Sequence, residues 1–317
     1  MHDIFTSELK AIIEFLSGLT IFLFSIKLIS TTMEENLSFK AKNIVNKLTY
    51  NKIYGVCIGF FLTSLMQSSS LTTILILTLA HSKIITIKKS IPIIIGANIG
   101  TTITSQITSF DIDNILPYIL ILGIVLFMYS ESHKVKLISL FILCFSLIFI
   151  GIELMGSSIE SIRTSPKLSI YISYIYDNRL KAILFGTIFS ALIHSSSTSV
   201  VLLQIMSNSG VIPIKTAIYV LLGLNLGTCI DVVIAGFTTN IYGKRVAVAH
   251  ILFNLIGIFI FIFIGDILLK IVVNLSANNI PRQIANAHTI FNITTALLIL
   301  PFSDKLANLS SKAIKDH

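Results

Sequence analysis

The sequence predicts an all-α polytopic membrane protein with two inverted-topology repeats, each containing a re-entrant helical hairpin that carries a serine-rich motif. Two observations lead to this fold class. The first is composition: the 317 residues are 54% hydrophobic and only 12% charged, whereas a soluble globular chain has roughly 25% charged residues. The second is an internal duplication around two polar stretches, "QSSS" at 67–70 and "HSSS" at 194–197.

Long apolar runs recur along the chain, and a run of some 20 residues can cross a hydrocarbon layer of about 30 Å as a helix. The mean hydropathy of +0.89 agrees with a polytopic membrane protein. The N-terminal segment contains acidic residues and lacks a cleavage-site pattern, so we interpret the first run as a retained spanning helix and not as a signal peptide. The runs cover 11–31, 115–129, 137–157, 246–269 and 284–302.

The net charge of +8 does not indicate a nucleic-acid partner, because the basic residues lie mostly between the apolar runs. The cysteines Cys57, Cys144 and Cys229 are isolated in apolar segments. Their spacing predicts neither a transition-metal site nor a disulfide framework. We therefore expect no nucleic acid, no cofactor apart from a coupling ion, and no enzymatic activity.

The duplication extends beyond the serine motifs. At an offset of 127 residues, 63–110 aligns without a gap to 190–237, and "GANIGTT" at 96–102 falls on "GLNLGTC" at 223–229. A weaker match, "FSIKLISTTME" with "IGIELMGSSIE" at 150–160, runs at an offset of 126 and aligns Lys27 with Glu153. We expect these two residues to pair with each other, in a structural role.

The orientation of the repeats follows from the number of crossings. Residues 55–66 and 69–81 are too short to span separately, and a re-entrant hairpin with the serines near its tip accommodates them. Three spans near 87–109, 114–130 and 136–158 then separate the motifs, which inverts the second unit. We predict inverted repeats at 11–130 and 136–272, an extra spanning helix at 282–303 and a short cytoplasmic tail at 304–317. We predict the cell inner (plasma) membrane as the location, and the loop charges favour an orientation with the N-terminus outside and the C-terminus cytoplasmic.

The serine motifs are candidate anion-binding sites. Serines at a hairpin tip open a new helix, whose free backbone N–H groups and dipole attract anions. The alternative is that Ser68 to Ser70 and Ser195 to Ser197 cap helix kinks and allow close packing. The duplication of the cluster favours a binding site.

The two "G-x-N-x-G-T" stretches are candidate cation sites, because amide and hydroxyl oxygens suit a small hard cation such as Na⁺. The candidates are Asn98, Thr101, Asn225 and Thr228. Glycines that permit tight helix packing are the alternative. Asp231, where the first repeat has Thr104, could bind a monovalent cation, carry a proton, or simply face water at a helix end.

A shorter echo lies near the C-terminus, where "AHILFN" at 249–254 and "AHTIFN" at 287–292 share four residues at the same spacing. His250 with Asn254, and His288 with Asn292, each lie on one helical face. We favour structural hydrogen bonding for both histidines.

Paired "QSSS"-type motifs, each followed by a "GANIGT"-type segment, resemble the sodium–phosphate cotransporter family (type II Na/Pi cotransporters). The "FLFSIKLIS" and "AHxxFN" segments are similar to bacterial members, and the resemblance covers roughly 11–303. It implies a symporter of inorganic phosphate in the lipid bilayer with Na⁺ as the coupling ion, without the PhoU-like C-terminal domain of some members. Carried over by position, the phosphate site comprises Gln67, Ser68, Ser69, Ser70, His194, Ser195, Ser196 and Ser197.

Two residues depart from the family pattern: His194 stands where the family has glutamine, and Asp231 interrupts the usual threonine-rich continuation. Either could change the anion or the coupling ion, because imidazole can become a cation near neutral pH. A membrane sensor or channel that binds phosphate, and a transporter of another oxyanion, remain alternatives. An intramembrane serine hydrolase is disfavoured, because the first motif has Gln67 and catalysis needs no duplicated site. The sequence is compatible with a homodimer but does not determine the oligomeric state.

Overall fold

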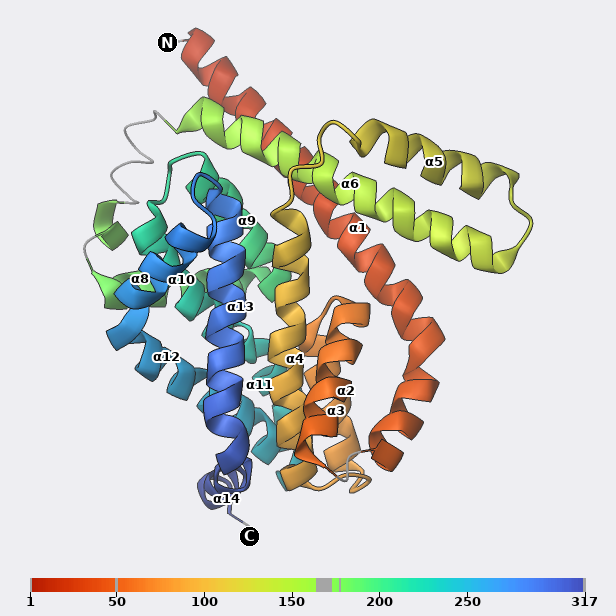
Figure 1. Ribbon diagram of the computed structural model, residues 1–317, viewed down its shortest axis with the longest axis vertical. Coiled ribbons are helices and arrows are strands. Elements are labelled where there is room, and N and C mark those ends of the chain that lie inside the picture. Colours follow the sequence, from red (N-terminus) through yellow and green to blue (C-terminus); the bar gives the residue numbers. More distant parts are fainter. Residues whose placement is uncertain (1, 49–50, 164–172, 177, 316–317) are drawn as a thin grey trace.

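The structure is a computed structural model that describes residues 2–48, 51–163, 173–176 and 178–315. Within these ranges the chain forms α-helices joined by short connections, with one 3₁₀ turn and no strand (Figure 1). The predicted all-helical class is confirmed. The two chain ends lie at opposite ends of the long axis in Figure 1.

In the part of the chain that the structure describes, five helical segments are long and apolar enough to cross a membrane, as expected of a multi-pass membrane protein. Four of them contain the expected runs 11–31, 137–157, 246–269 and 284–302. The run 115–129 instead forms α5 (Leu116–Tyr129), whose 14 residues reach only about 21 Å at 1.5 Å per residue. The five segments are Glu8–Glu35, His133–Ser161, Ile214–Phe237, Ile241–Leu275 and Ile280–Ala313.

The expected span at 87–109 forms α4 (Ile87–Thr108), which has 22 residues but is not among the five. Polar residues such as Asn98 and Gln106 lower its hydropathy, and most of the helix is buried among other helices. The length of this helix was predicted correctly. Its apolar character was overestimated.

Each serine motif joins two short helices. The first motif connects α2 (Lys52–Met66) to α3 (Ser69–His81), and the second connects α8 (Arg179–Ile193) to α9 (Ser196–Asn208). After each pair the chain continues into a longer buried segment, α4 in one case and α10 (Ile214–Gly227) with α11 (Cys229–Phe237) in the other.

Glycines bring α2 onto α4 and α8 onto α10 at very short range. A Cβ added to Gly96 would lie 2.0 Å from the carbonyl oxygen of Val56, and one added to Gly223 would lie 1.9 Å from that of Ile183. No side chain fits at such distances, so the backbones of the paired helices touch there. The glycines of "GANIG" and "GLNLG" therefore serve helix packing.

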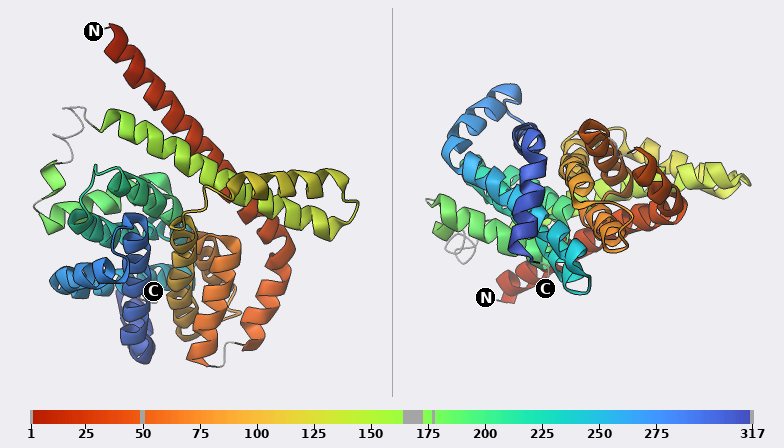
Figure 2. Two further views of the ribbon diagram at one scale, coloured as in Figure 1. Left: turned by 45° about the horizontal axis from the view of Figure 1, so that its top comes forward. Right: turned by 90° about the horizontal axis from the view of Figure 1, so that it is seen from below.

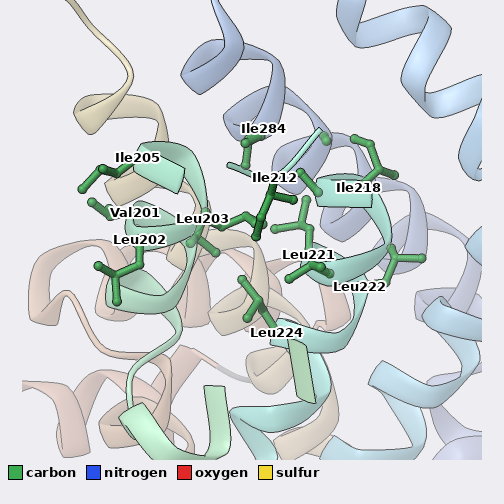
Figure 3. Close-up of a cluster of buried hydrophobic side chains, with 14 of the residues drawn as sticks. Val201, Leu202, Leu203, Ile205, Ile212, Ile218, Leu221, Leu222, Leu224 and Ile284 are labelled. Carbon is green, nitrogen blue, oxygen red and sulfur yellow. The ribbon is translucent and has the colours of Figure 1, made fainter. Parts of the chain in front are cut away.

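The largest apolar core lies where α9, α10 and α13 (Ile280–Ile299) meet (Figure 3). Leu203 of α9, Leu221 of α10 and Ile284 of α13 are each at most 2% exposed. The core continues into α12 (Ile241–Leu275), where the rings of Phe261 and Phe291 meet edge to face with centroids 5.0 Å apart. This packing holds the second serine motif against the centre of the protein.

The long helix α1 (His2–Leu48) crosses α6 (His133–Ile162), and α5 lies alongside α6 (Figures 1 and 2). The crossing is close because Gly18 meets Gly151, and a Cβ on either glycine would lie 2.7 Å from the carbonyl oxygen of the other. Beyond α13, a 3₁₀ turn (Leu300–Phe302) leads into α14 (Ser303–Ala313). The expected tail is thus largely helical, and Lys52 anchors it through an ion pair to Asp304 at 2.7 Å.

Candidate functional site

The two serine motifs have the same backbone geometry. Gln67 and His194 both adopt the left-handed conformation, at φ 53°, ψ 22° and φ 56°, ψ 26°, which is uncommon for residues other than glycine. Ser68 and Ser195 are both extended, and the Oγ of each accepts a hydrogen bond at 3.2 Å from the backbone N–H three residues later. Each motif thus ends one helix and caps the start of the next.

The starts of α3 and α9 meet at the centre of the protein. The Oγ atoms of Ser69 and Ser196 lie 3.3 Å apart, although 127 residues separate them in the chain. Both side chains are buried, at 4% and 8% exposure. Two helix N-termini therefore converge, which brings two positive dipole ends and several free N–H groups toward one region.

A cavity of about 830 Å³, here called the serine cavity, opens beside this contact. Both motifs line it, together with residues of α1 and α11. Six of the eight predicted phosphate-site residues are at its wall, namely Gln67, Ser68, Ser70, His194, Ser195 and Ser196. Its charged and titratable residues are Lys27, Glu34, His194 and Asp231.

The predicted cation candidate Asp231 belongs to the serine cavity. Asp231 Oδ1 lies 2.5 Å from His194 Nδ1, and Asp231 Oδ2 accepts a hydrogen bond from the Ser70 hydroxyl at 2.8 Å. The Asp231 side chain is 15% exposed and that of His194 is 54% exposed. The carboxylate thus joins the tip of one motif to the third serine of the other.

Thr104 likewise connects the two motifs, by bonding Gln67 of the first and Ser197 of the second. From the sequence, Thr104 was noted only as the counterpart of Asp231. Its hydroxyl donates to Gln67 Oε1 at 2.6 Å and accepts from the Ser197 hydroxyl at 3.3 Å. The equivalence at offset 127 was the signal that could have identified it.

The other four cation candidates lie in helix interfaces and are not among the residues that line the serine cavity. Asn98 and Asn225 each donate from Nδ2 at 2.9 Å to the carbonyl oxygen four residues earlier. Thr101 and Thr228 bond backbone carbonyls of their own helices, at 3.1 and 2.8 Å. Among the described residues, the structure groups Asp231 with the serines and separates it from these four.

The side-chain oxygen of Asn225 faces the second "AHxxFN" segment. It accepts hydrogen bonds from His288 Nε2 at 3.3 Å and from Asn292 Nδ2 at 3.4 Å. On its other edge, His288 Nδ1 lies 3.3 Å from the Ser105 hydroxyl. His288 therefore links α13 to α10 and α4, the kind of structural bonding expected of it.

A second cavity of about 540 Å³, here called the acidic cavity, is separate from the first. Its charged lining residues are Asp111, Asp113, Glu153, Glu160 and Arg163. Lys27 lines the serine cavity and Glu153 the acidic one, and no ion pair joins them among the described residues. The expected pairing of Lys27 with Glu153 is therefore wrong, because the α1–α6 crossing directs the two side chains to different cavities.

The linings of the two cavities correspond in sequence. Lys27 and Glu34 of the serine cavity match Glu153 and Glu160 of the acidic cavity at offset 126. At offset 127, Ile74 and Ala235 of the serine cavity match Val201 and Thr108 of the acidic one. Equivalent surfaces of the two duplicated units thus line two distinct cavities.

Gln204 borders the acidic cavity and was not singled out from the sequence. Its Nε2 donates to the carbonyl oxygens of Ser105 and Pro281 at 3.0 and 2.9 Å, and its Oε1 accepts from the Thr108 hydroxyl at 3.0 Å. At 2% exposure it clamps α9 to α4 and α13. A glutamine within the apolar run of α9 was the available signal.

Comparisons with known proteins find several sequences similar to this chain. The chain is 28% identical over 63% of its length to "Uncharacterized protein YqeW" of Bacillus subtilis, covering 65% of that protein. It is 22% identical over 96% of its length to "Putative inorganic phosphate export protein YjbB" of Escherichia coli, covering 56% of it. The human "Sodium-dependent phosphate transport protein 2B" is 44% identical over 19% of the chain and 9% of its own length.

The chain thus spans between about half and two thirds of the length of these bacterial relatives. No solved structure matches it significantly. The family model described as Na+/Pi-cotransporter matches two successive stretches, residues 21–157 and 158–277. With its paired serine motifs meeting beside a cavity, the chain belongs to the Na⁺/Pi-cotransporter family.

Proposed function

We propose that the chain is a sodium-coupled symporter of inorganic phosphate that works by alternating access around the serine cavity. The observation that carries this proposal is the contact between Ser69 and Ser196, whose Oγ atoms lie 3.3 Å apart at the converging starts of α3 and α9. Hydroxyl groups and helix N-termini together suit the oxygens of phosphate.

The charges at the serine cavity support a need for a co-transported cation. Phosphate near neutral pH carries about one to two negative charges. Lys27 and His194 share the lining of this cavity with Glu34 and Asp231, so the lining brings no large excess of positive charge. Hydroxyls and helix dipoles alone are a weak counterbalance for a desolvated anion. Bound Na⁺ would supply the missing attraction, and each ligand would then strengthen binding of the other.

Two inverted repeats, at 11–130 and 136–272, would supply the alternation. In this scheme α2–α3 and α8–α9 are re-entrant hairpins, 282–303 is an extra spanning helix, and 304–317 is a cytoplasmic tail. The matched linings of the serine and acidic cavities support the scheme, because inverted units give equivalent pathways on opposite faces of a membrane. We place the protein in the cell inner membrane with its N-terminus outside.

The test is radiolabelled phosphate flux in proteoliposomes with and without a sodium gradient, imposed in each direction. Both directions matter, because one relative is named as a phosphate exporter and another as a sodium-dependent phosphate transport protein. We expect flux that requires Na⁺ and is lost in the Ser69→Ala, Ser196→Ala double variant.

The matched control is Ser139→Ala, Ser146→Ala, because both serines are buried on α6 and each donates to a carbonyl oxygen of its own helix. This control should transport at the wild-type rate. Phosphate binding without concentrative flux would instead indicate a sensor or channel. Flux of another oxyanion in preference to phosphate would change the substrate.

A further inference from the structure

A small cavity of about 160 Å³, here called the basic pocket, lies where α2, α4 and α14 meet. The starts of these helices are at the end of the molecule that carries the C-terminus (Figure 1). In the lining that the structure describes, positively charged side chains outnumber negatively charged ones by three to one. The four charged residues are Lys52, Lys88, Lys89 and Asp304.

The single acid leaves most of this positive charge unbalanced. Asp304 Oδ2 accepts a hydrogen bond from Lys52 Nζ at 2.7 Å, which pairs one lysine. Lys88 and Lys89 form no ion pair with the described part of the chain, and both are exposed. Lysines held at one small cavity repel each other, and an anion bound between them would relieve that repulsion. The side chains are thus accessible to an anion from outside the protein.

The backbone around the pocket adds to this positive potential. α2 begins at Lys52, α4 at Ile87 and α14 at Ser303. The N-terminal end of a helix carries a partial positive charge and free N–H groups. At the start of α4, the side chain of the cap residue Thr86 does not bond these groups. The three helix starts therefore strengthen the attraction that the lysines exert on an anion.

The second repeat has an equivalent of this place, and there the side chains satisfy one another. Arg179 matches Lys52 at offset 127 and pairs with Asp266 at 2.6 Å. Tyr219 matches Pro92 and donates to the other carboxylate oxygen of Asp266 at 3.1 Å. The Arg179 guanidinium lies 5.1 Å from the centroid of the Tyr219 ring. A large aromatic side chain thus completes a closed network where the first repeat has a small proline lining a cavity.

The number of lysines differs between the repeats as well. Lys88 matches Lys215, but Lys89 matches the uncharged Thr216. The duplicated helix pair therefore packs without the third lysine in one repeat and retains it in the other. Helix packing does not explain why the first repeat concentrates positive charge at this cavity, and a bound anion does.

We propose that the basic pocket binds a phosphate group, held by Lys88 and Lys89 and by Lys52, which the group shares with Asp304. Lysine ammonium groups and helix N-termini both bind phosphate oxygens in proteins. The group can belong to free inorganic phosphate or to the headgroup of an anionic lipid at the membrane surface. The basic pocket shares no lining residue with the serine cavity, and the inference does not depend on the proposed transport.

The test is the thermal unfolding of the purified protein in a non-ionic detergent, followed by circular dichroism in sodium-free buffer. One probe is potassium phosphate, which replaces potassium chloride at constant ionic strength. The other is phosphatidylglycerol, which replaces phosphatidylcholine in mixed micelles. A ligand that binds only the folded state raises the midpoint temperature, so the concentration needed for a given rise reports the affinity.

The double variant Lys88→Gln, Lys89→Gln removes two exposed charges and keeps most of the side-chain bulk. We expect it to need about tenfold more of the effective probe than the wild type for the same rise. The matched control is Lys305→Gln, Lys312→Gln, which removes two exposed charges from α14 at positions outside the lining of the pocket. This control should respond as the wild type does. Phosphate bound in the serine cavity contributes equally to all three proteins, so the differences report the basic pocket.

A further variant, Asp304→Asn, tests the pocket in the opposite direction. It removes the acid and releases Lys52 for the ligand, so the same rise should need about tenfold less of the effective probe. A loss of folding stability would lower the unfolding temperature measured without the probe. It would not reproduce opposite changes in the response to the probe.

The two probes identify the source of the phosphate group. A weaker response to potassium phosphate in the lysine double variant indicates free phosphate, and a weaker response to phosphatidylglycerol indicates a lipid headgroup. The proposal is overturned if neither probe distinguishes this double variant from the control pair, or if Asp304→Asn does not strengthen the response.

Discussion

His194 contacts Asp231 in the second repeat as Gln67 contacts Thr104 in the first, at 2.5 and 2.6 Å. Asp231 and Thr104 also each accept a hydrogen bond from the third serine of the other repeat's motif, Ser70 for Asp231 and Ser197 for Thr104. The two departures from the family pattern are therefore in contact with each other. A neutral amide–hydroxyl pair in one repeat is replaced by an imidazole–carboxylate pair in the other.

This relationship predicts that the two departures compensate. Asp231→Thr alone leaves His194 without its anion, and His194→Gln alone leaves a poorly exposed carboxylate without its partner. We expect each single variant to lower sodium-dependent phosphate flux about tenfold, whereas the double variant, which restores the first-repeat pair, stays within about threefold of the wild type. Flux measured in all four proteins gives the coupling, and independent losses that simply multiply in the double variant would contradict it.

The separation of Lys27 from Glu153 predicts unequal effects on phosphate. Lys27 lines the serine cavity, so Lys27→Gln removes a cation that attracts the anion and should raise the half-saturating phosphate concentration about tenfold. Glu153→Gln, in the acidic cavity, should change it less than twofold. The half-saturating concentrations of the two variants are compared in flux assays in which phosphate is supplied on the side of the membrane to which the serine cavity opens. Equal effects would indicate that the two residues act as a pair.

The close glycine contacts predict that a Gly→Ala substitution lowers the free energy of unfolding at some positions and not at others. In Gly223→Ala the new Cβ would lie 1.9 Å from the Ile183 carbonyl oxygen, so α8 and α10 must separate. We expect a loss of about 3 kcal/mol in the free energy of unfolding. Gly156→Ala is the control, because its nearest contact is 4.0 Å away, and it should be neutral or stabilising by up to about 1 kcal/mol. Thermal unfolding by circular dichroism measures both variants, and similar losses would argue against the close helix contact.

Gln204 predicts a graded loss of stability. Leu77 is the first-repeat equivalent of Gln204, so Gln204→Leu copies the first repeat at this position. The variant loses three hydrogen bonds that join α9 to α4 and α13. The free energy of unfolding should fall by about 2 to 3 kcal/mol, since buried acceptors lose their donors. Thr108→Val removes only one of these bonds and should cost about 1 kcal/mol. A Gln204→Leu protein as stable as the wild type would show that the clamp contributes nothing.

Much of the fold and part of the candidate site could be predicted from the sequence, because their determinants are local. Long apolar runs specify helices whatever their partners, and most of the expected runs became such helices. The serine motifs could be located because a polar cluster inside an apolar run stands out, and its repetition showed that it was no accident. The exceptions are α5, which is strongly apolar but only 14 residues long, and α4, which is long enough but less apolar than expected.

The sequence by itself determined the helical class, the duplication and the family of this protein, all of which depend on patterns within short windows. Only the tertiary structure decided which side chains meet. Asp231 is 37 residues from His194 and 161 from Ser70, yet it contacts both. Lys27 and Glu153 hold matching positions and face different cavities. Periodicity fixes the face of a helix on which a residue lies, but the crossing and rotation of packed helices fix what that face meets.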